Sequence, residues 1–112
     1  VTRDELLKNG QLRATPRGEV LYADMKAFVN GKQYSEGNVS QMHWTFAEIL
    51  ERASYGVTLY PGDVIGSGTV GTGCFLELNG SKITDNLWLK VGDEVALEVE
   101  GLGRLENTIA SA

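Results

Sequence analysis

Four glycines lie within the eight residues from Gly66 to Gly73, and they constrain this chain more than any other feature. A regular helix or strand through them would be weak, because glycine loses more conformational freedom on folding than any other residue. The same freedom lets the backbone turn tightly and lets a ligand approach the amide groups closely. Thr69, at the centre, adds a hydroxyl group. The segment is interpreted as a rigid substrate-binding loop.

The residues on either side of the glycines predict a turn and short strands. Pro61 and Gly62 suit the two central positions of a type II turn, since proline presets φ and glycine accepts a positive φ. Val64 and Ile65 then predict a short buried strand. Residues 75–78 and 82–84 predict a hairpin, because they bracket the turn-forming sequence Asn-Gly-Ser.

The glycine spacing also spells the dinucleotide-binding pattern G-x-G-x-x-G after a predicted strand. That pattern needs a helix to begin at the third glycine, whereas here another glycine follows, and then Cys74, Phe75 and Leu76. Two alternatives to the substrate loop therefore stay open, nucleotide binding and a purely structural β connection. The substrate loop is favoured over both.

A family resemblance extends over nearly the whole chain. The motif L-x-P-G-D-V-I-x-x-G-T is followed by GCFLEL and by KVGDEVALEVEGLGRLENTI, and MHWTFAEILERAS precedes it. Together these motifs resemble the C-terminal part of the fumarylacetoacetate hydrolase family. The resemblance implies a mainly β fold with one helix, forming part of a mixed β-sandwich roll.

The resemblance also implies a function for the complete protein. It implies a metal-dependent enzyme of 2-oxo or 2,4-dioxo acids, and first of all a hydrolase that cleaves a carbon–carbon bond in a substrate of the fumarylacetoacetate or acylpyruvate type. Relatives also decarboxylate, isomerise or dehydrate such acids. Mg²⁺ or Ca²⁺ would chelate the oxo groups of the substrate.

The metal-binding part of the family motif is missing from this chain. Its Glu-x-Glu pair, its aspartates and the Lys and Arg for the substrate lie upstream of the matching region. Residues 1–112 are therefore expected to be the C-terminal portion of a catalytic domain, inactive alone, with the metal ligands outside the chain. The expected partners are a small-molecule oxo acid, the upstream part of the same enzyme and a second copy in a homodimer.

Three residues receive roles from the resemblance. Thr69 matches the family's Gly-Thr, where the hydroxyl and the amides around Gly68 meet a carboxylate or oxo group of the substrate. A threonine that only bonds its own turn is the alternative. Glu77 matches a glutamate that, in fumarylacetoacetate hydrolase, orients a histidine that deprotonates the attacking water. Strand alternation would equally make Glu77 a surface residue.

Other candidates have simpler interpretations. Glu98 and Glu100 lie on one face of a predicted strand and do not match the family's metal motif, so a solvated sheet face is favoured. His43 is expected to pack or cap, and Cys74 to be a small buried residue. The large aromatic residues are expected in the core, namely Trp44, Phe46 and Trp88. No nearby set of residues resembles a catalytic triad, a zinc site or a phosphate loop.

Local patterns predict further elements. Thr45 begins a helix with Glu48 as its capping-box partner, and the apolar positions of its face are Phe46, Ile49, Leu50 and Ala53. Residues 2–7 predict a short capped helical turn. Asn30-Gly31 predicts a hairpin between strands at 20–29 and 32–34. The remaining segments predict connections at 11–18 and 35–41 and strands at 95–100 and 105–109.

Composition limits the class of protein. The 112 residues are enough for one domain or a piece of one, with 42% hydrophobic and 22% charged residues. A net charge of −5 disfavours nucleic acid and anionic membranes as partners. No window is long and apolar enough for a membrane span. The single cysteine excludes an internal disulfide and suits a reducing compartment, so a cytoplasmic location is expected.

A second hypothesis belongs to a different class of protein. The chain alone would be a non-catalytic β module that packs on an upstream chain or associates with itself through exposed apolar surface.

Overall fold

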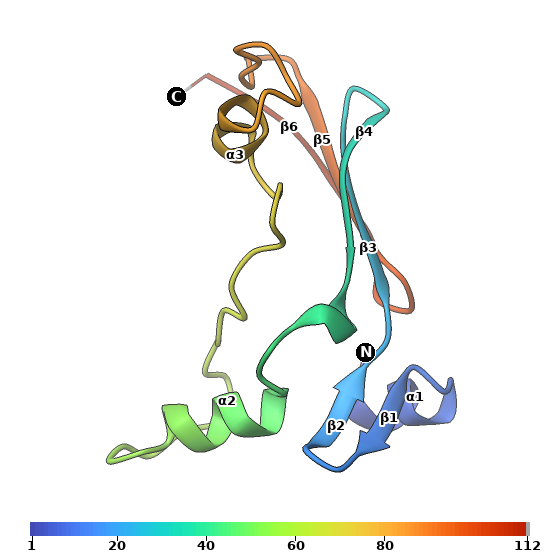
Figure 1. The fold of residues 1–112 in the computed structure, drawn as a ribbon, viewed down its shortest axis with the longest axis vertical. Coiled ribbons are helices and arrows are strands. Elements are labelled where there is room, and N and C mark those ends of the chain that lie inside the picture. Colours follow the sequence, from blue (N-terminus) through green and yellow to red (C-terminus); the bar gives the residue numbers. More distant parts are fainter. Residues whose placement is uncertain (112) are drawn as a thin grey trace.

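The computed structural model describes residues 1–111 and is built mainly of antiparallel β-strands with a few short helices (Figure 1). The elements in chain order are α1 (Arg3–Lys8), β1 (Leu12–Thr15), β2 (Gly18–Leu21), β3 (Asp24–Val29), β4 (Lys32–Asn38), the 3-10 helix η1 (Val39–Gln41), α2 (Phe46–Ala53), α3 (Phe75–Gly80), β5 (Glu94–Val99) and β6 (Gly103–Thr108). Strands β1 and β2 form a hairpin, and the larger sheet has the order β4-β3-β5-β6. The predicted mainly β fold class is confirmed. In residues 1–111, no helix has the length and apolarity needed to cross a bilayer.

The turns and helix caps that depend only on neighbouring residues form as the sequence predicts. Asn30 and Gly31 have φ of 50° and 76°, as a tight hairpin turn between β3 and β4 requires. Thr2 and Thr45 each form a capping box, with Glu5 and Glu48 respectively. The backbone N–H of Thr45, together with the Arg17 guanidinium, lowers the pKa of Glu48 below its ordinary value.

The predicted hairpin at residues 75–84 is wrong, because residues 75–80 form helix α3. The helix ends in a Schellman motif, in which the Ile83 N–H donates to the Leu78 carbonyl at 2.9 Å and the Lys82 N–H to the Asn79 carbonyl at 3.1 Å. Asn79 does not form a turn either, since its side chain bonds Thr84 and the backbone of Leu87. Apolar residues at 75, 76 and 78 fit a helix as well as a strand, so alternation over four residues could not distinguish them.

Two segments expected to be connections contain strands. Residues 12–15 form β1, and β4 continues to Asn38 before η1 begins. The pairing of β3 with β4 shifts by one residue, because Ala27 pairs with Ser35 and Phe28 with Gln33. Tyr34 is left as the extra residue of a β-bulge. The polar composition of residues 35–38 concealed a strand at the edge of the sheet.

The two L-x-x-G-D sequences form the same turn. Gly62 and Gly92 have φ of 102° and 93°. The Asp63 carboxylate accepts from the Tyr60 N–H at 2.8 Å, and the Asp93 carboxylate from the Lys90 N–H at 2.8 Å. The Asp93 turn leads into β5, which pairs with β3 and β6. The Asp63 turn leads into Val64 and Ile65, which form no strand, so the strand predicted there is wrong.

The core is small and aliphatic. Leu21, Ala23 and Val39 form its buried cluster, and Leu6, Leu12, Met25, Met42 and Val99 pack against it. The aromatic residues expected in the core are instead exposed, at 58% for Trp44, 40% for Phe46 and 48% for Trp88. This prediction is wrong because the described residues cover only part of these side chains, and Leu50 on the apolar face of α2 is likewise 48% exposed.

The segment between α2 and α3 crosses from one end of the molecule to the other without joining a sheet (Figure 1). We call residues 57–73 the strap. Val64 in the strap is 96% exposed. From Val64 to Thr69, the strap makes no backbone–backbone hydrogen bond to any described residue. The glycine loop is the part of the strap nearest α3.

A close contact joins the N-terminal hairpin to the turn between β5 and β6. The buried Gln11 side chain donates from Nε2 to the Glu100 carbonyl at 2.9 Å. A Cβ on Gly101 would collide with the amide group of Gln11. Gly101 also has a φ of 76°, which disfavours other residues.

Gly101→Ala is therefore expected to lower the free energy of unfolding by roughly 1–2 kcal/mol for the left-handed backbone and by roughly 1–3 kcal/mol more for the collision. Gly10→Ala is the matched control, because Gly10 has a φ of 75° and nothing within 4 Å of its added Cβ. Urea unfolding of both variants checks this. Equal losses in the two variants would show that the contact with Gln11 is unimportant.

Candidate functional site

The glycine loop forms one wall of a pocket of about 350 Å³. Gly68 and Thr69, the two predicted substrate-binding residues, both line it. The opposite wall comes from β2, β3, η1, the start of α2, the end of β5 and the turn after it. Its apolar side chains are Leu21, Met25, Val39, Met42, Phe46, Val99 and Leu102. No charged side chain is among the residues that line the pocket. It therefore offers amides and hydroxyls on one side and an apolar surface on the other.

Two of the four glycines are required by the geometry of the loop. Gly68 has a φ of 85°, in the region that favours glycine. A Cβ on Gly73 would lie 2.7 Å from the Val70 carbonyl oxygen, which accepts from the Gly73 N–H at 2.8 Å. Gly66 and Gly71 have neither constraint. The loop thus turns at Gly68 and closes again between Val70 and Gly73.

The Thr69 hydroxyl is available to a ligand. Between Gly66 and Gly71, the only side-chain hydrogen bond to residues 1–111 runs from the Ser67 hydroxyl to the Gly68 carbonyl, at 3.5 Å. Thr69 is exposed and does not bond its own turn. The local-turn alternative for this threonine therefore has no support in the geometry.

Glu77 lies on α3 and does not line the pocket. Its Oε2 accepts from the Gly73 N–H at 2.9 Å. The Gly73 N–H is thus shared between Glu77 and the Val70 carbonyl. The contact links Glu77 directly to the closing turn of the glycine loop, a connection that sequence reasoning missed because it expected residues 75–78 to be a strand.

The structure separates the remaining candidates from this pocket. His43 packs edge-on against Trp44, with 4.8 Å between ring centroids, and is not among the residues that line the pocket of the glycine loop. Cys74 is exposed at the start of α3, so its predicted burial is wrong. Glu98 pairs with Arg104 at 3.4 Å, and Glu100 accepts from the Asp24 N–H at 3.3 Å.

The comparison with protein families bears on one open interpretation of the glycine loop, the dinucleotide-binding one. A family model described as the C-terminal region of fumarylacetoacetate hydrolase matches residues 1–110. The chain belongs to the fumarylacetoacetate hydrolase family. The dinucleotide-binding alternative loses its basis, because α3 begins only after the fourth glycine and the loop is part of this family's pattern.

Individual relatives differ in the reactions their names describe. A mitochondrial oxaloacetate tautomerase of Bos taurus is 39% identical over 82 residues, covering 72% of this chain and 24% of the relative. The homoprotocatechuate catabolism bifunctional isomerase/decarboxylase of Escherichia coli is 34% identical over 87 residues, covering 78% of this chain and 17% of the relative. The solved fumarylacetoacetate hydrolase of Exiguobacterium antarcticum matches with a TM-score of 0.65 at 28% identity, covering 85% of this chain and 35% of that chain. This member of the family therefore spans only a minor part of each relative.

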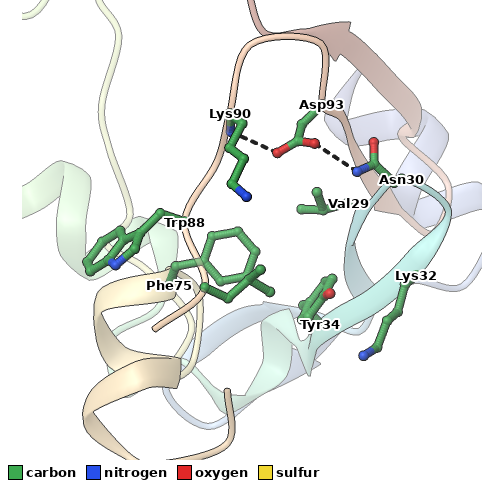
Figure 2. A pocket seen from close by; sticks show the side chains of 9 residues that line it. Val29, Asn30, Lys32, Tyr34, Phe75, Trp88, Lys90 and Asp93 are labelled. Atoms are coloured by element: carbon green, nitrogen blue, oxygen red, sulfur yellow. Dashed lines mark hydrogen bonds between the residues drawn. The ribbon is translucent and has the colours of Figure 1, made fainter. Parts of the chain in front are cut away.

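A second pocket, of about 380 Å³, lies where α3 meets the β3–β4 hairpin (Figure 2). The Phe75 ring packs edge-on against Tyr34, with 5.2 Å between centroids, and so fixes α3 to the bulge of β4. Figure 2 shows Asp93 held by Asn30 and by the Lys90 backbone. The Asn30 side-chain amide and the Lys90 N–H lower the pKa of Asp93 below its ordinary value. The packing of Phe75 on Tyr34 beside this pocket positions the helix that carries Glu77.

The described residues, 1–111, do not bring together a metal site. Across residues 1–111, no group of three or more His, Cys, Asp or Glu side chains could hold a metal ion. Glu98 and Glu100 have the same Glu-x-Glu spacing as the family's metal-binding pair, but both already have partners within the protein.

Residues 1–112 alone are therefore expected to bind neither Mg²⁺ nor Ca²⁺ with micromolar affinity, because too few oxygen ligands converge. Isothermal titration calorimetry on chelator-treated protein measures this. Stoichiometric binding in the micromolar range would mean that the metal ligands lie within this chain and not outside it.

Proposed function

We propose that this chain supplies the substrate loop of a hydrolase that cleaves a carbon–carbon bond in a 2,4-dioxo acid of the fumarylacetoacetate or acylpyruvate type. The observation that carries the proposal is the pocket in which Gly68 and the free Thr69 hydroxyl face an apolar wall. Such an acid has an anionic head that needs hydrogen-bond donors and an acyl tail that tolerates an apolar surface. The pocket offers both.

In the proposed reaction, water gives up a proton as it attacks the carbonyl carbon C4, and the C3–C4 bond then breaks. The electron pair of that bond remains on C3 as an enolate, which takes up a proton to give the second product. Thr69 and the amides around Gly68 would hold the carboxylate or oxo group, since donors fixed in advance stabilise an oxyanion at little reorganisation cost. Glu77 would help to activate the water through a histidine supplied from outside this chain. Enzymes of the family generally use a divalent metal. Its ligands, for Mg²⁺ or Ca²⁺, would also lie outside this chain.

Other reactions of the family are the nearest alternatives. The names of the relatives include a tautomerase and an isomerase/decarboxylase. Tautomerisation and isomerisation keep every carbon atom in one molecule, decarboxylation releases carbon dioxide, and dehydration releases water. Hydrolysis of 2,4-dioxopentanoate, by contrast, yields acetate and pyruvate. Product analysis with this compound therefore separates the proposed reaction from its alternatives.

The role of Glu77 can be separated from its hydrogen bond to the loop. In the complete enzyme, Glu77→Gln should lower kcat for 2,4-dioxopentanoate by about 100-fold or more, because an amide cannot assist proton transfer. Its KM should change little, because the glutamine oxygen can still accept from the Gly73 N–H. Glu77→Ala should lose turnover equally and also raise KM.

Glu98→Gln is the matched control, because Glu98 pairs with Arg104 on the sheet, away from the pocket. It should keep the turnover of the unmodified enzyme. Retained turnover in Glu77→Gln would remove Glu77 from the catalytic step.

The second candidate function is a non-catalytic β module, and the strap favours it. Val64 is 96% exposed, Tyr60 68% and Val57 61%. The unpaired backbone from Val64 to Thr69 is a template for an added strand. The partner would be an upstream chain or a second copy of this chain. The two candidates differ in whether that partner brings catalytic groups.

The intact mass of every polypeptide in a purified, denatured sample separates the two candidates. The enzyme proposal expects a longer chain, or a second chain that co-purifies and carries the metal ligands. A single species of 12.2 kDa would favour the module.

The cytoplasmic location expected from the sequence stays a prediction.

A further inference from the structure

The glycine loop packs closely against the sheet where Val70 meets Gly37. A Cβ added to Gly37, on β4, would lie 2.9 Å from Val70 Cγ1 and 3.5 Å from Val70 Cγ2. Gly37 does not have a positive φ, so its backbone conformation does not require glycine. What requires glycine at residue 37 is the Val70 side chain, which occupies the space that a Cβ would fill.

Val70 is suited to hold a backbone in place. Its side chain branches at Cβ and has few χ1 states, so a displaced methyl group moves the backbone with it. Val70 is only partly exposed, whereas its neighbours Thr69 and Gly71 are exposed. Its carbonyl also accepts the hydrogen bond that closes the loop at Gly73. Val70 is therefore fixed on the sheet side by its methyl groups and on the α3 side by its carbonyl.

We propose that the contact of Val70 with Gly37 is the positioning contact of the substrate loop, which sets where the Thr69 hydroxyl lies in the pocket. This inference rests on the proposed function, since it assumes that Thr69 meets the substrate. Neither Gly37 nor Val70 reacts. They act through Thr69, which is the adjacent residue in the chain.

The contact makes substrate binding depend on two residues that lie far apart in the sequence. Adding a methyl group at residue 37 must move Val70, because the new Cβ and the Val70 Cγ1 cannot both stay where they are. Removing both Val70 methyl groups makes room again. The substitution Val70→Ala should therefore relieve the effect of Gly37→Ala, which a substitution at an independent site would not do.

The test uses four variants of the complete enzyme: Gly37→Ala, Val70→Ala, the double variant, and Gly80→Ala as the control. Gly80 also lacks a positive φ, and nothing lies within 4 Å of its added Cβ. Gly37→Ala should shift the ¹⁵N-labelled amide resonances of residues 67–71 and raise KM for 2,4-dioxopentanoate about tenfold or more, with kcat less affected. The double variant should return both quantities most of the way, and Gly80→Ala should leave them unchanged.

Loop resonances that stay in place in Gly37→Ala would overturn the inference, and so would a shift of the loop without a change in KM. A double variant no better than Gly37→Ala would overturn it as well. Thr69→Val, measured in parallel, separates these failures from failure of the proposed function. If Thr69→Val leaves KM unchanged, Thr69 does not meet the substrate. If Thr69→Val raises KM and Gly37→Ala does not, only the positioning role is wrong.

Discussion

An extended segment becomes a strand only when another backbone lies beside it, and this requirement shapes the whole chain. The two L-x-x-G-D turns have the same hydrogen bonds and the same glycine conformation. After the second turn, β5 finds β3 on one side and β6 on the other. After the first, Val64 and Ile65 find no partner among residues 1–111 and remain an extended strap. The same turn therefore leads into a strand in one place and into an exposed segment in the other.

The same distinction explains which elements could be predicted. The caps at Thr2 and Thr45 and the turn at Asn30-Gly31 depend on residues within four positions of each other, and the sequence contains all that they need. Helix α3 depends on more distant residues. Its end is held by bonds that reach Thr84 and Leu87, and its start by the packing of Phe75 on Tyr34. Alternation within residues 75–78 does not contain that information.

The candidate site was predictable to a similar extent. Glycine spacing and the resemblance pointed to Gly68 and Thr69, and both line the pocket. The apolar wall opposite them was not predictable, because Met25 and Phe46 reach it from separate elements, and Phe46 was expected in the core. The glycine at residue 37 gave no signal in a single sequence. Its importance depends on Val70, which follows it by more than thirty residues and meets it only in the folded chain.

Glu77 has a structural role apart from any reaction, because it accepts a hydrogen bond from the Gly73 amide. The Gly73 N–H donates to the Val70 carbonyl and to the Glu77 carboxylate, so the loop and α3 are held by one shared hydrogen. A carboxylate accepts such a bond more strongly than a neutral oxygen does. The side chain proposed to assist proton transfer thus also holds the end of the glycine loop. Under the proposed function, a glutamate in this position would link substrate binding to water activation, because both would depend on the geometry of the same few atoms.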